Sequence, residues 1–232
     1  MITNNVIQRV FRLRYRGQTG TGFLIDIEGQ QYFVTAKHVL HATDAQGQLI
    51  DPLQAGSNID IFRDNAWLPL PVVSVAHSAD SDVSIFTLRI QIPAHPLPAN
   101  MSGLVYGQDV FFLGFPYGLS FDVGEVNRNF PMPLVKKGIV SAMFFTEPGQ
   151  RFFVDGHNNP GFSGGPVVFK VPGENDFKIA GVISGYAPEH RVVNGALEPI
   201  ENTNSGIITA YSINNAQRLI EEIQARQNEL IS

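Results

Sequence analysis

The stretch from Asn158 to Phe169, NNPGFSGGPVVF, places one serine, Ser163, among glycines and prolines directly before an apolar run. A serine hydroxyl is a weak nucleophile until a neighbouring base removes its proton. Glycines on both sides let the backbone turn tightly and approach a bound molecule without a side chain in between. The stretch therefore predicts a reactive serine, although Ser163 taken alone could equally be an ordinary turn residue.

One candidate for this stretch is the nucleophile elbow of α/β-hydrolases, G-x-S-x-G. That elbow needs a strand before the serine, a helix after it, and then the acid and the histidine further along the chain. Here the turn-like HNNPG precedes Ser163 and the strand-like VVFKV follows it. Only 27 residues separate Ser163 from His190, too few for the strands and helices of a hydrolase sheet. The elbow is excluded.

The other candidate is a catalytic triad in the chain order His, Asp, Ser. His38 follows the apolar run in FVTAKHVLH, and Asp82 begins another run in SDVSIFTL, with separations of 44 and 81 residues along the chain to Ser163. We predict His38 as general base and acid, Asp82 as the residue that orients it, and Ser163 as nucleophile. The backbone N–H groups of Gly161 and Ser163 are the predicted oxyanion hole.

Each of these residues also has a purely structural interpretation. His38 could be a core histidine, and Asp82 could simply cap a strand. His41 competes with His38 but lies outside the motif, and Asp80 competes with Asp82 although the strand begins directly after Asp82. Taken together, the order and the residue types favour the triad.

Seven motifs in order along the chain resemble those of trypsin-like (chymotrypsin-fold) serine proteases, most closely the protease domain of the bacterial HtrA/Deg type. They are GTGFLI, VTAKHVL, SDVSIFTL, GQDVFFLGFPYGL, KGIVSA, NPGFSGGPV and AGVISGY. The resemblance begins at about Gly20, and no PDZ domain is expected after the C-terminal helix. It implies a serine endopeptidase that acts on a peptide or protein. The alternative is a latent or inactive protease-fold module that binds peptides and needs a regulatory protein partner.

The same resemblance assigns the substrate-binding residues. It implies that Ser184, Gly185 and Tyr186 offer backbone hydrogen bonds to an extended peptide. His157 is expected at the base of the primary pocket, where its charge near neutral pH would favour an acidic or polar residue. If His157 points away instead, the pocket is apolar and shaped by Ile207 and Ile208. A preference for lysine or arginine is not supported.

Phe162 departs from the pattern. Digestive trypsins carry an aspartate directly before the serine, and that aspartate pairs with a newly cut N-terminal amine to switch the enzyme on. Phe162 cannot form this ion pair. Activation by N-terminal cleavage is therefore not expected here.

Short strand-like runs with 22 glycines and 15 prolines in the chain predict an all-β fold of two six-stranded antiparallel β-barrels. The proline-rich segment 91–103 indicates a linker between them. We expect an N-terminal barrel over 1–95, a C-terminal barrel over 96–211, and a helix over 212–232 that packs on the barrels. Ser212 is the expected N-cap of this helix. Its expected apolar face comprises Ile213, Ala216, Ile220, Ile223 and Leu230.

Charge and composition limit which classes of binding partner, cofactor and location the sequence supports. A net charge of -5 argues against nucleic acid or an anionic membrane as the main partner. No ligand cluster or phosphate loop is present in the sequence, so no metal or organic cofactor is implied. The absence of cysteine and of a signal-peptide pattern favours the cytoplasm. A secreted or periplasmic chain trimmed of its leader would look the same.

Overall fold

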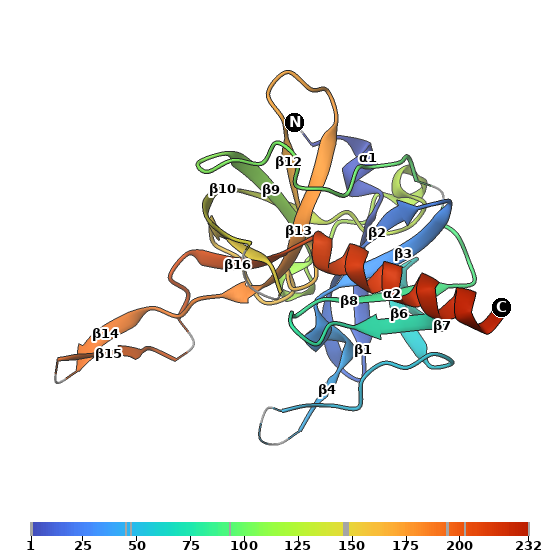
Figure 1. The fold of residues 1–232 in the computed structure, drawn as a ribbon, viewed down its shortest axis with the longest axis horizontal. Coiled ribbons are helices and arrows are strands. Elements are labelled where there is room, and N and C mark those ends of the chain that lie inside the picture. The colour runs from blue at the N-terminus through green and yellow to red at the C-terminus, as the bar shows by residue number, and fades with distance from the viewer. Residues whose placement is uncertain are drawn as a thin grey trace.

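The described residues form two closed six-stranded antiparallel barrels and one long helix. Figure 1 shows how the strands and the helix are arranged in space. This computed structural model describes residues 2–231 apart from 45, 47, 93, 146–148, 194 and 202, with side chains as far as residue 226. The predicted all-β, two-barrel architecture with a C-terminal helix is confirmed.

The first barrel lies between Val10 and Leu88 and is blue to teal in Figure 1. Successive residues of a strand point to opposite faces, and inward side chains such as Leu13 are fully buried. The rings of Phe33 and Phe86 stack 4.8 Å apart between neighbouring strands. In order around the barrel the strands are β1 (Val10–Tyr15), β2 (Gln18–Ile27), β3 (Gln30–Thr35), β8 (Ser84–Leu88), β7 (Ala66–His77) and β6 (Asn58–Arg63).

The second barrel is built in the same way around phenylalanines and valines. Phe112 is fully buried, and the ring of Phe162 packs against it edge to face at 5.1 Å. Phe162 is therefore a core residue of this barrel. The strands in order are β10 (Leu134–Phe144), β11 (Arg151–Asp155), β16 (Ile207–Ser212), β13 (Phe177–Tyr186), β12 (Pro166–Lys170) and β9 (Asp109–Gly114).

Helix α2 (Asn214–Ile231), red in Figure 1, lies against the molecule's own barrels. Its apolar side joins a core cluster that also contains residues from both barrels, such as Phe23 and Leu113. The backbone N–H of Asn214 donates to Ser212 Oγ at 3.1 Å, which satisfies one free donor at the helix start. Of the expected apolar face, the side chain of Leu230 lies outside the described residues, Ile223 is partly buried, and the fully buried members are Ile213, Ala216 and Ile220.

A hairpin of strands β14 (His190–Val193) and β15 (Ala196–Pro199) projects from the second barrel, away from the rest of the molecule in Figure 1.

Among the described residues, no helix is both long enough and apolar enough to cross a membrane. The remaining short elements are α1 (Asn4–Ile7), η1 (Lys37–Leu40), β4 (Ala42–Thr43), β5 (Leu49–Ile50), η2 (Pro116–Gly118) and η3 (Gly124–Asn127).

Candidate active site

His38 and Asp82 lie beside the paired ends of two strands of the first barrel. β3 and β8 are antiparallel, and Thr35 pairs with Ser84 at the end of their register. His38 follows Thr35 in the turn η1, and Asp82 comes just before Ser84, so both side chains emerge at one edge. His38 Nδ1 lies 2.7 Å from Asp82 Oδ2, and the backbone N–H of His38 donates to Asp82 Oδ1 at 2.9 Å. These two contacts fix the imidazole and the carboxylate relative to each other.

The carboxyl group of Asp82 is largely enclosed, with 19% of its side chain exposed. Burial by itself raises the pKa of Asp82, but hydrogen bonds from His38 and Ser184 and the charge of His38 lower that pKa below its ordinary 3.8. Asp82 is therefore a carboxylate at neutral pH and accepts the Nδ1–H of His38. Within the described chain the other ring nitrogen of His38, Nε2, has no hydrogen-bond partner.

The loop that carries Ser163 is fastened to the first barrel through Thr21 of β2. The backbone N–H of Thr21 donates to the carbonyl of Ser163 at 2.8 Å. Its side-chain hydroxyl donates to the carbonyl of Gly161 at 2.7 Å and accepts the N–H of Phe115 at 3.2 Å. Thr21 is fully buried, so these bonds are shielded from water. The serine loop is thus held against the barrel that carries His38 and Asp82.

Ser184 on β13 links Ser163 to Asp82. The Ser184 carbonyl accepts a hydrogen bond from Ser163 Oγ at 3.1 Å, while the Ser184 hydroxyl donates to Asp82 Oδ2 at 2.6 Å. In the part of the chain that the structure describes, no hydrogen bond joins Ser163 to His38. The pair of His38 and Asp82 is assembled, and the serine hydroxyl is directed at β13.

Two backbone N–H groups of the serine loop donate no hydrogen bond to any described residue. In a trans peptide the N–H points opposite to the preceding carbonyl. The Pro160 carbonyl accepts the N–H of Tyr117, and the Phe162 carbonyl accepts the N–H of Gly165, both at 2.8 Å. The N–H groups of Gly161 and Ser163 therefore point away from these bonds, and neither has an acceptor among the described residues. Gly161 has φ +107°, a conformation that favours glycine.

The sequence pattern of the family described as "Trypsin-like peptidase domain" matches residues 20–173, more than half of the chain. The chain belongs to the trypsin-like peptidase family. The predicted resemblance to trypsin-like proteases is thereby confirmed. No curated protein matches the sequence.

Solved structures of proteases share the fold of this trypsin-like peptidase. The active form of the Rv3671c protease from M. tuberculosis is 17% identical, over 93% of this chain and 81% of that chain, with a TM-score of 0.61. Its inactive form is 18% identical, over 93% and 89%, with a TM-score of 0.57. The HtrA-type protease AlgW with tripeptide is 19% identical, over 95% of this chain and 60% of that chain, with a TM-score of 0.60. At such identities the likeness shows the fold alone, and this chain spans less than two thirds of the AlgW chain.

Strand β13 of this trypsin-like peptidase has an open backbone edge at Ser184, Gly185 and Tyr186, the residues predicted to bind a peptide. One side of this segment pairs with β16. On the other side β12 pairs with β13 only as far as Val182, so no described strand covers the edge. Space is also available at Gly185, which has no atom within 4 Å of where a Cβ would stand.

The three residues predicted at the primary pocket lie in different surroundings. Ile207 is 42% exposed and lines a pocket of about 410 Å³ at the base of the hairpin β14–β15. Ile208 is fully buried in the second barrel, because successive strand residues point to opposite faces, and it does not line this pocket. His157 is exposed, and its carbonyl accepts a hydrogen bond from Lys136. Of the three residues, only Ile207 lines this pocket, and the assignment of all three to the primary pocket stays a prediction.

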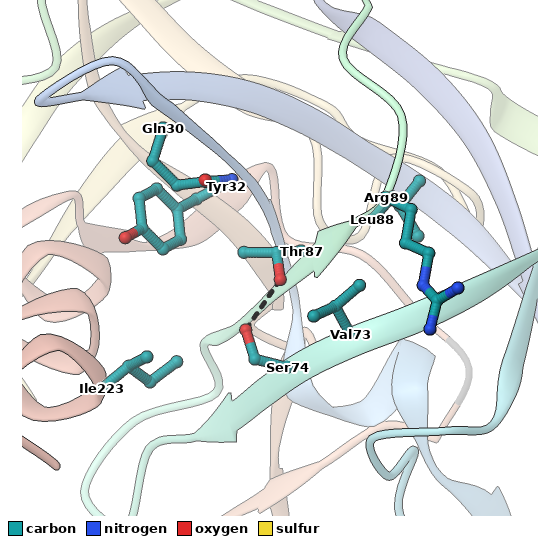
Figure 2. Close-up of a pocket in the computed structure, with 8 residues that line it drawn as sticks. All are labelled: Gln30, Tyr32, Val73, Ser74, Thr87, Leu88, Arg89 and Ile223. Carbon is teal, nitrogen blue, oxygen red and sulfur yellow. Dashed lines mark hydrogen bonds between the residues drawn. The ribbon is translucent and has the colours of Figure 1, made fainter. Parts of the chain in front are cut away.

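Two further pockets differ in chemistry. A pocket of about 420 Å³ is lined by both His38 and Asp82. Another of about 450 Å³, between the first barrel and α2, contains none of the predicted site residues, as Figure 2 shows. There the hydroxyls of Ser74 and Thr87 lie 2.7 Å apart and satisfy each other. Of these two pockets, only the first has an acid–base pair in its wall.

Three contributions to the site were not predicted. They are the side chain of Thr21, the hydroxyl of Ser184, and Lys136, whose Nζ donates to Asn159 Oδ1 at 3.0 Å. Thr21 stands within the GTGFLI motif, so its position carried a signal. Ser184 also stands within a motif, AGVISGY, but no local pattern indicates that its hydroxyl bonds Asp82 or that Lys136 contacts Asn159. Within the described residues, no group of three His, Cys, Asp or Glu side chains is placed to hold a metal ion.

Proposed function

We propose that this trypsin-like peptidase is a serine endopeptidase with Ser163 as nucleophile, His38 as general base and acid, and Asp82 as the residue that orients His38. The observation that carries the proposal is that Ser184 contacts both Ser163 and Asp82. Ser184 thereby links the proposed nucleophile to the carboxylate that bonds His38. Family membership supports a peptide or protein substrate.

In the proposed mechanism Asp82 holds Nδ1–H of His38, which leaves Nε2 to accept the proton of Ser163. Ser163 Oγ then attacks the carbonyl carbon of the scissile bond, and the N–H groups of Gly161 and Ser163 bind the oxyanion. Protonated His38 donates its proton to the leaving amine as the C–N bond breaks. Water attacks the resulting ester in the same way, and Ser163 regains its proton.

The hydrogen bond from Ser163 Oγ to the Ser184 carbonyl is compatible with these reaction steps. The hydroxyl must rotate about χ1 from the Ser184 carbonyl to His38, and side-chain rotamer changes of this kind take picoseconds to nanoseconds. A peptide laid along Ser184, Gly185 and Tyr186 presents its own N–H to the Ser184 carbonyl. Substrate binding would therefore displace the serine hydroxyl from that carbonyl and free it for His38.

The second candidate is a latent or inactive module that binds peptides and waits for a partner. The same contact favours it, because Ser163 Oγ is bonded to Ser184 and not to His38. In that case binding of a peptide to the edge of β13 would leave Ser163 unreactive.

Labelling with a fluorophosphonate probe tests the two candidates. For the endopeptidase we expect Ser163 to be labelled in the wild type and labelling to be lost in Ser163→Ala and His38→Ala. His41→Ala is the matched control, since His41 is three residues away and its ring bonds only to the Lys37 carbonyl among described groups. A folded wild type that takes no label would contradict the endopeptidase and favour the latent module.

A further inference from the structure

Phe162 leaves the serine loop without the ion pair that orders it in digestive trypsins. Its side chain is fully buried against Phe112 and offers no charge to any partner. The N–H groups of Gly161 and Ser163 nevertheless have no acceptor among the described residues. Thr21 holds the loop at the carbonyls of Gly161 and Ser163, and a further group can order the segment 157–160 that precedes them.

Lys136 of β10 is placed to do so. Its ammonium donates to the carbonyl of His157 and to Asn159 Oδ1, the latter at 3.0 Å. The same Nζ lies 5.7 Å from the centroid of the Phe162 ring, within the range of a cation–π contact. One ammonium thus contacts the loop at three residues that lie two to three positions apart.

The contacts of Lys136 are directed at the loop alone. Among the described residues, no carboxylate forms an ion pair with it. Its side chain is half-buried, and this partial burial lowers the pKa of Lys136. Charge-assisted hydrogen bonds are stronger than neutral ones, and partial shielding from water increases the difference.

Asn159 connects Lys136 to the orientation of the oxyanion donors. Its side-chain amide donates to the hydroxyl of Tyr117 at 3.2 Å, and the Tyr117 N–H fixes the Pro160 carbonyl. The Asn159 carbonyl accepts the N–H of Phe162 at 3.1 Å and closes a turn. Lys136 holds Asn159, which directly precedes Pro160, and the Tyr117 N–H holds the Pro160 carbonyl. These two contacts fix the Pro160–Gly161 peptide and therefore the direction of the Gly161 N–H.

We propose that Lys136 is a positioning residue whose ammonium orders the loop 157–160 and so keeps the oxyanion donors of Gly161 and Ser163 aligned. This ammonium belongs to a side chain and needs no cleavage to form. It serves in place of the N-terminal amine that trypsins release by cleavage. The catalytic part of this inference rests on the proposed endopeptidase activity. The ordering of the loop does not.

Activity tests the catalytic part. Lys136→Met keeps the length of the side chain and removes its charge and donors. We expect kcat to fall about 10²-fold, the loss typical of one missing oxyanion donor, with KM little changed. Lys136→Arg, which retains a charged donor, should recover most of kcat. Lys137→Met is the matched control, because Lys137 is exposed and, among the described residues, pairs only with Asp109, 2.8 Å away. Wild-type kcat in Lys136→Met would overturn the proposal.

Amide hydrogen exchange tests the ordering without any need for catalysis. We expect peptides covering residues 157–163 to exchange at least tenfold faster in Lys136→Met and at the wild-type rate in Lys137→Met. Equal exchange in all three proteins would overturn the proposal even if the wild type proves inactive. An unlabelled wild type with faster exchange in Lys136→Met would reject the endopeptidase and keep the positioning role. Should Lys136→Met fail to fold, Lys136→Gln, uncharged but polar, replaces it in both measurements.

Discussion

The hydroxyl of Ser184 donates a 2.6 Å hydrogen bond to the carboxylate of Asp82, and so joins the second barrel to the acid of the first. Asp82 Oδ2 receives this bond and that of His38 Nδ1 together. Because both donors favour the ionised form, they outweigh the burial of the carboxyl group. The orientation of His38 therefore depends on a residue that also borders the predicted peptide-binding edge.

Ser184→Ala removes the hydroxyl that bonds Asp82. It should therefore weaken both the orientation of His38 and the lowering of the Asp82 pKa. A hydrogen bond to a charged group contributes roughly 1.5–3 kcal/mol, so we expect kcat/KM to fall about tenfold or more. The pKa of Asp82 should rise, since one of the groups that lower it is gone. The measurement is the pH dependence of ester hydrolysis. Ser141→Ala, at an exposed serine of the same barrel, is the control and should keep the wild-type profile. A wild-type profile in Ser184→Ala would contradict this role.

Thr21→Val removes a hydroxyl and leaves the shape of the side chain nearly unchanged. The partly buried Gly161 carbonyl and the buried Phe115 N–H both lose a partner. Unsatisfied buried groups of this kind cost about 1–3 kcal/mol, and we expect the free energy of unfolding in urea to fall by that amount. Thr19→Val, at an exposed position of the same strand, serves as control. Equal unfolding midpoints for the two variants would show that the Thr21 hydroxyl does not fasten the loop.

Gly161→Ala combines backbone strain with a collision. A Cβ at Gly161 would stand 2.3 Å from the Phe115 carbonyl oxygen, and φ is +107°. The loop must shift to accommodate it, which misaligns the N–H of residue 161, and kcat should fall by about 10²–10³. Gly17→Ala isolates the strain, because Gly17 also has positive φ, +87°, but open space around it. Steady-state hydrolysis compares them, and similar kcat values for both variants would refute the assignment of Gly161.

Local motifs made part of the site predictable from the sequence, whereas contacts between distant segments left no local signal. His38 and Asp82 were predictable because each stands in a local motif next to a strand, and pairing of β3 with β8 brings strand ends together. Ile207 and Ile208 were expected at one pocket, although strand alternation sends adjacent side chains to opposite faces. Lys136 looked like any charged strand residue. Its role depends on a loop 21 residues further along, and only the closed barrel brings the two together.

The packing around His77 predicts that the protein loses stability in mild acid. His77 Nε2 lies 2.9 Å from the Leu53 carbonyl, which only accepts, so Nε2 carries the proton. Nδ1 lies 2.7 Å from the hydroxyl of Ser84 and accepts from it as a neutral ring. Burial lowers the pKa of His77 below its ordinary 6.5, the bond to the Leu53 carbonyl raises it by less, and His41 and Lys37 add smaller lowering effects.

The unfolded chain therefore takes up the proton of His77 more readily than the folded one. The contribution of the neutral His77 ring to the free energy of unfolding is complete above pH 6.5. It is lost as the pH falls through the lowered pKa of His77 in the folded state. We expect the free energy of unfolding to decrease between pH 7 and 5, and His77→Gln to flatten this decrease. His190→Gln, at an exposed histidine of the hairpin, should retain the wild-type slope. Asp82 adds a separate loss below pH 3.8, because its own pKa is lowered by folding. Urea unfolding across this range checks the prediction, and a slope unaffected by His77→Gln would show that the buried imidazole does not set it.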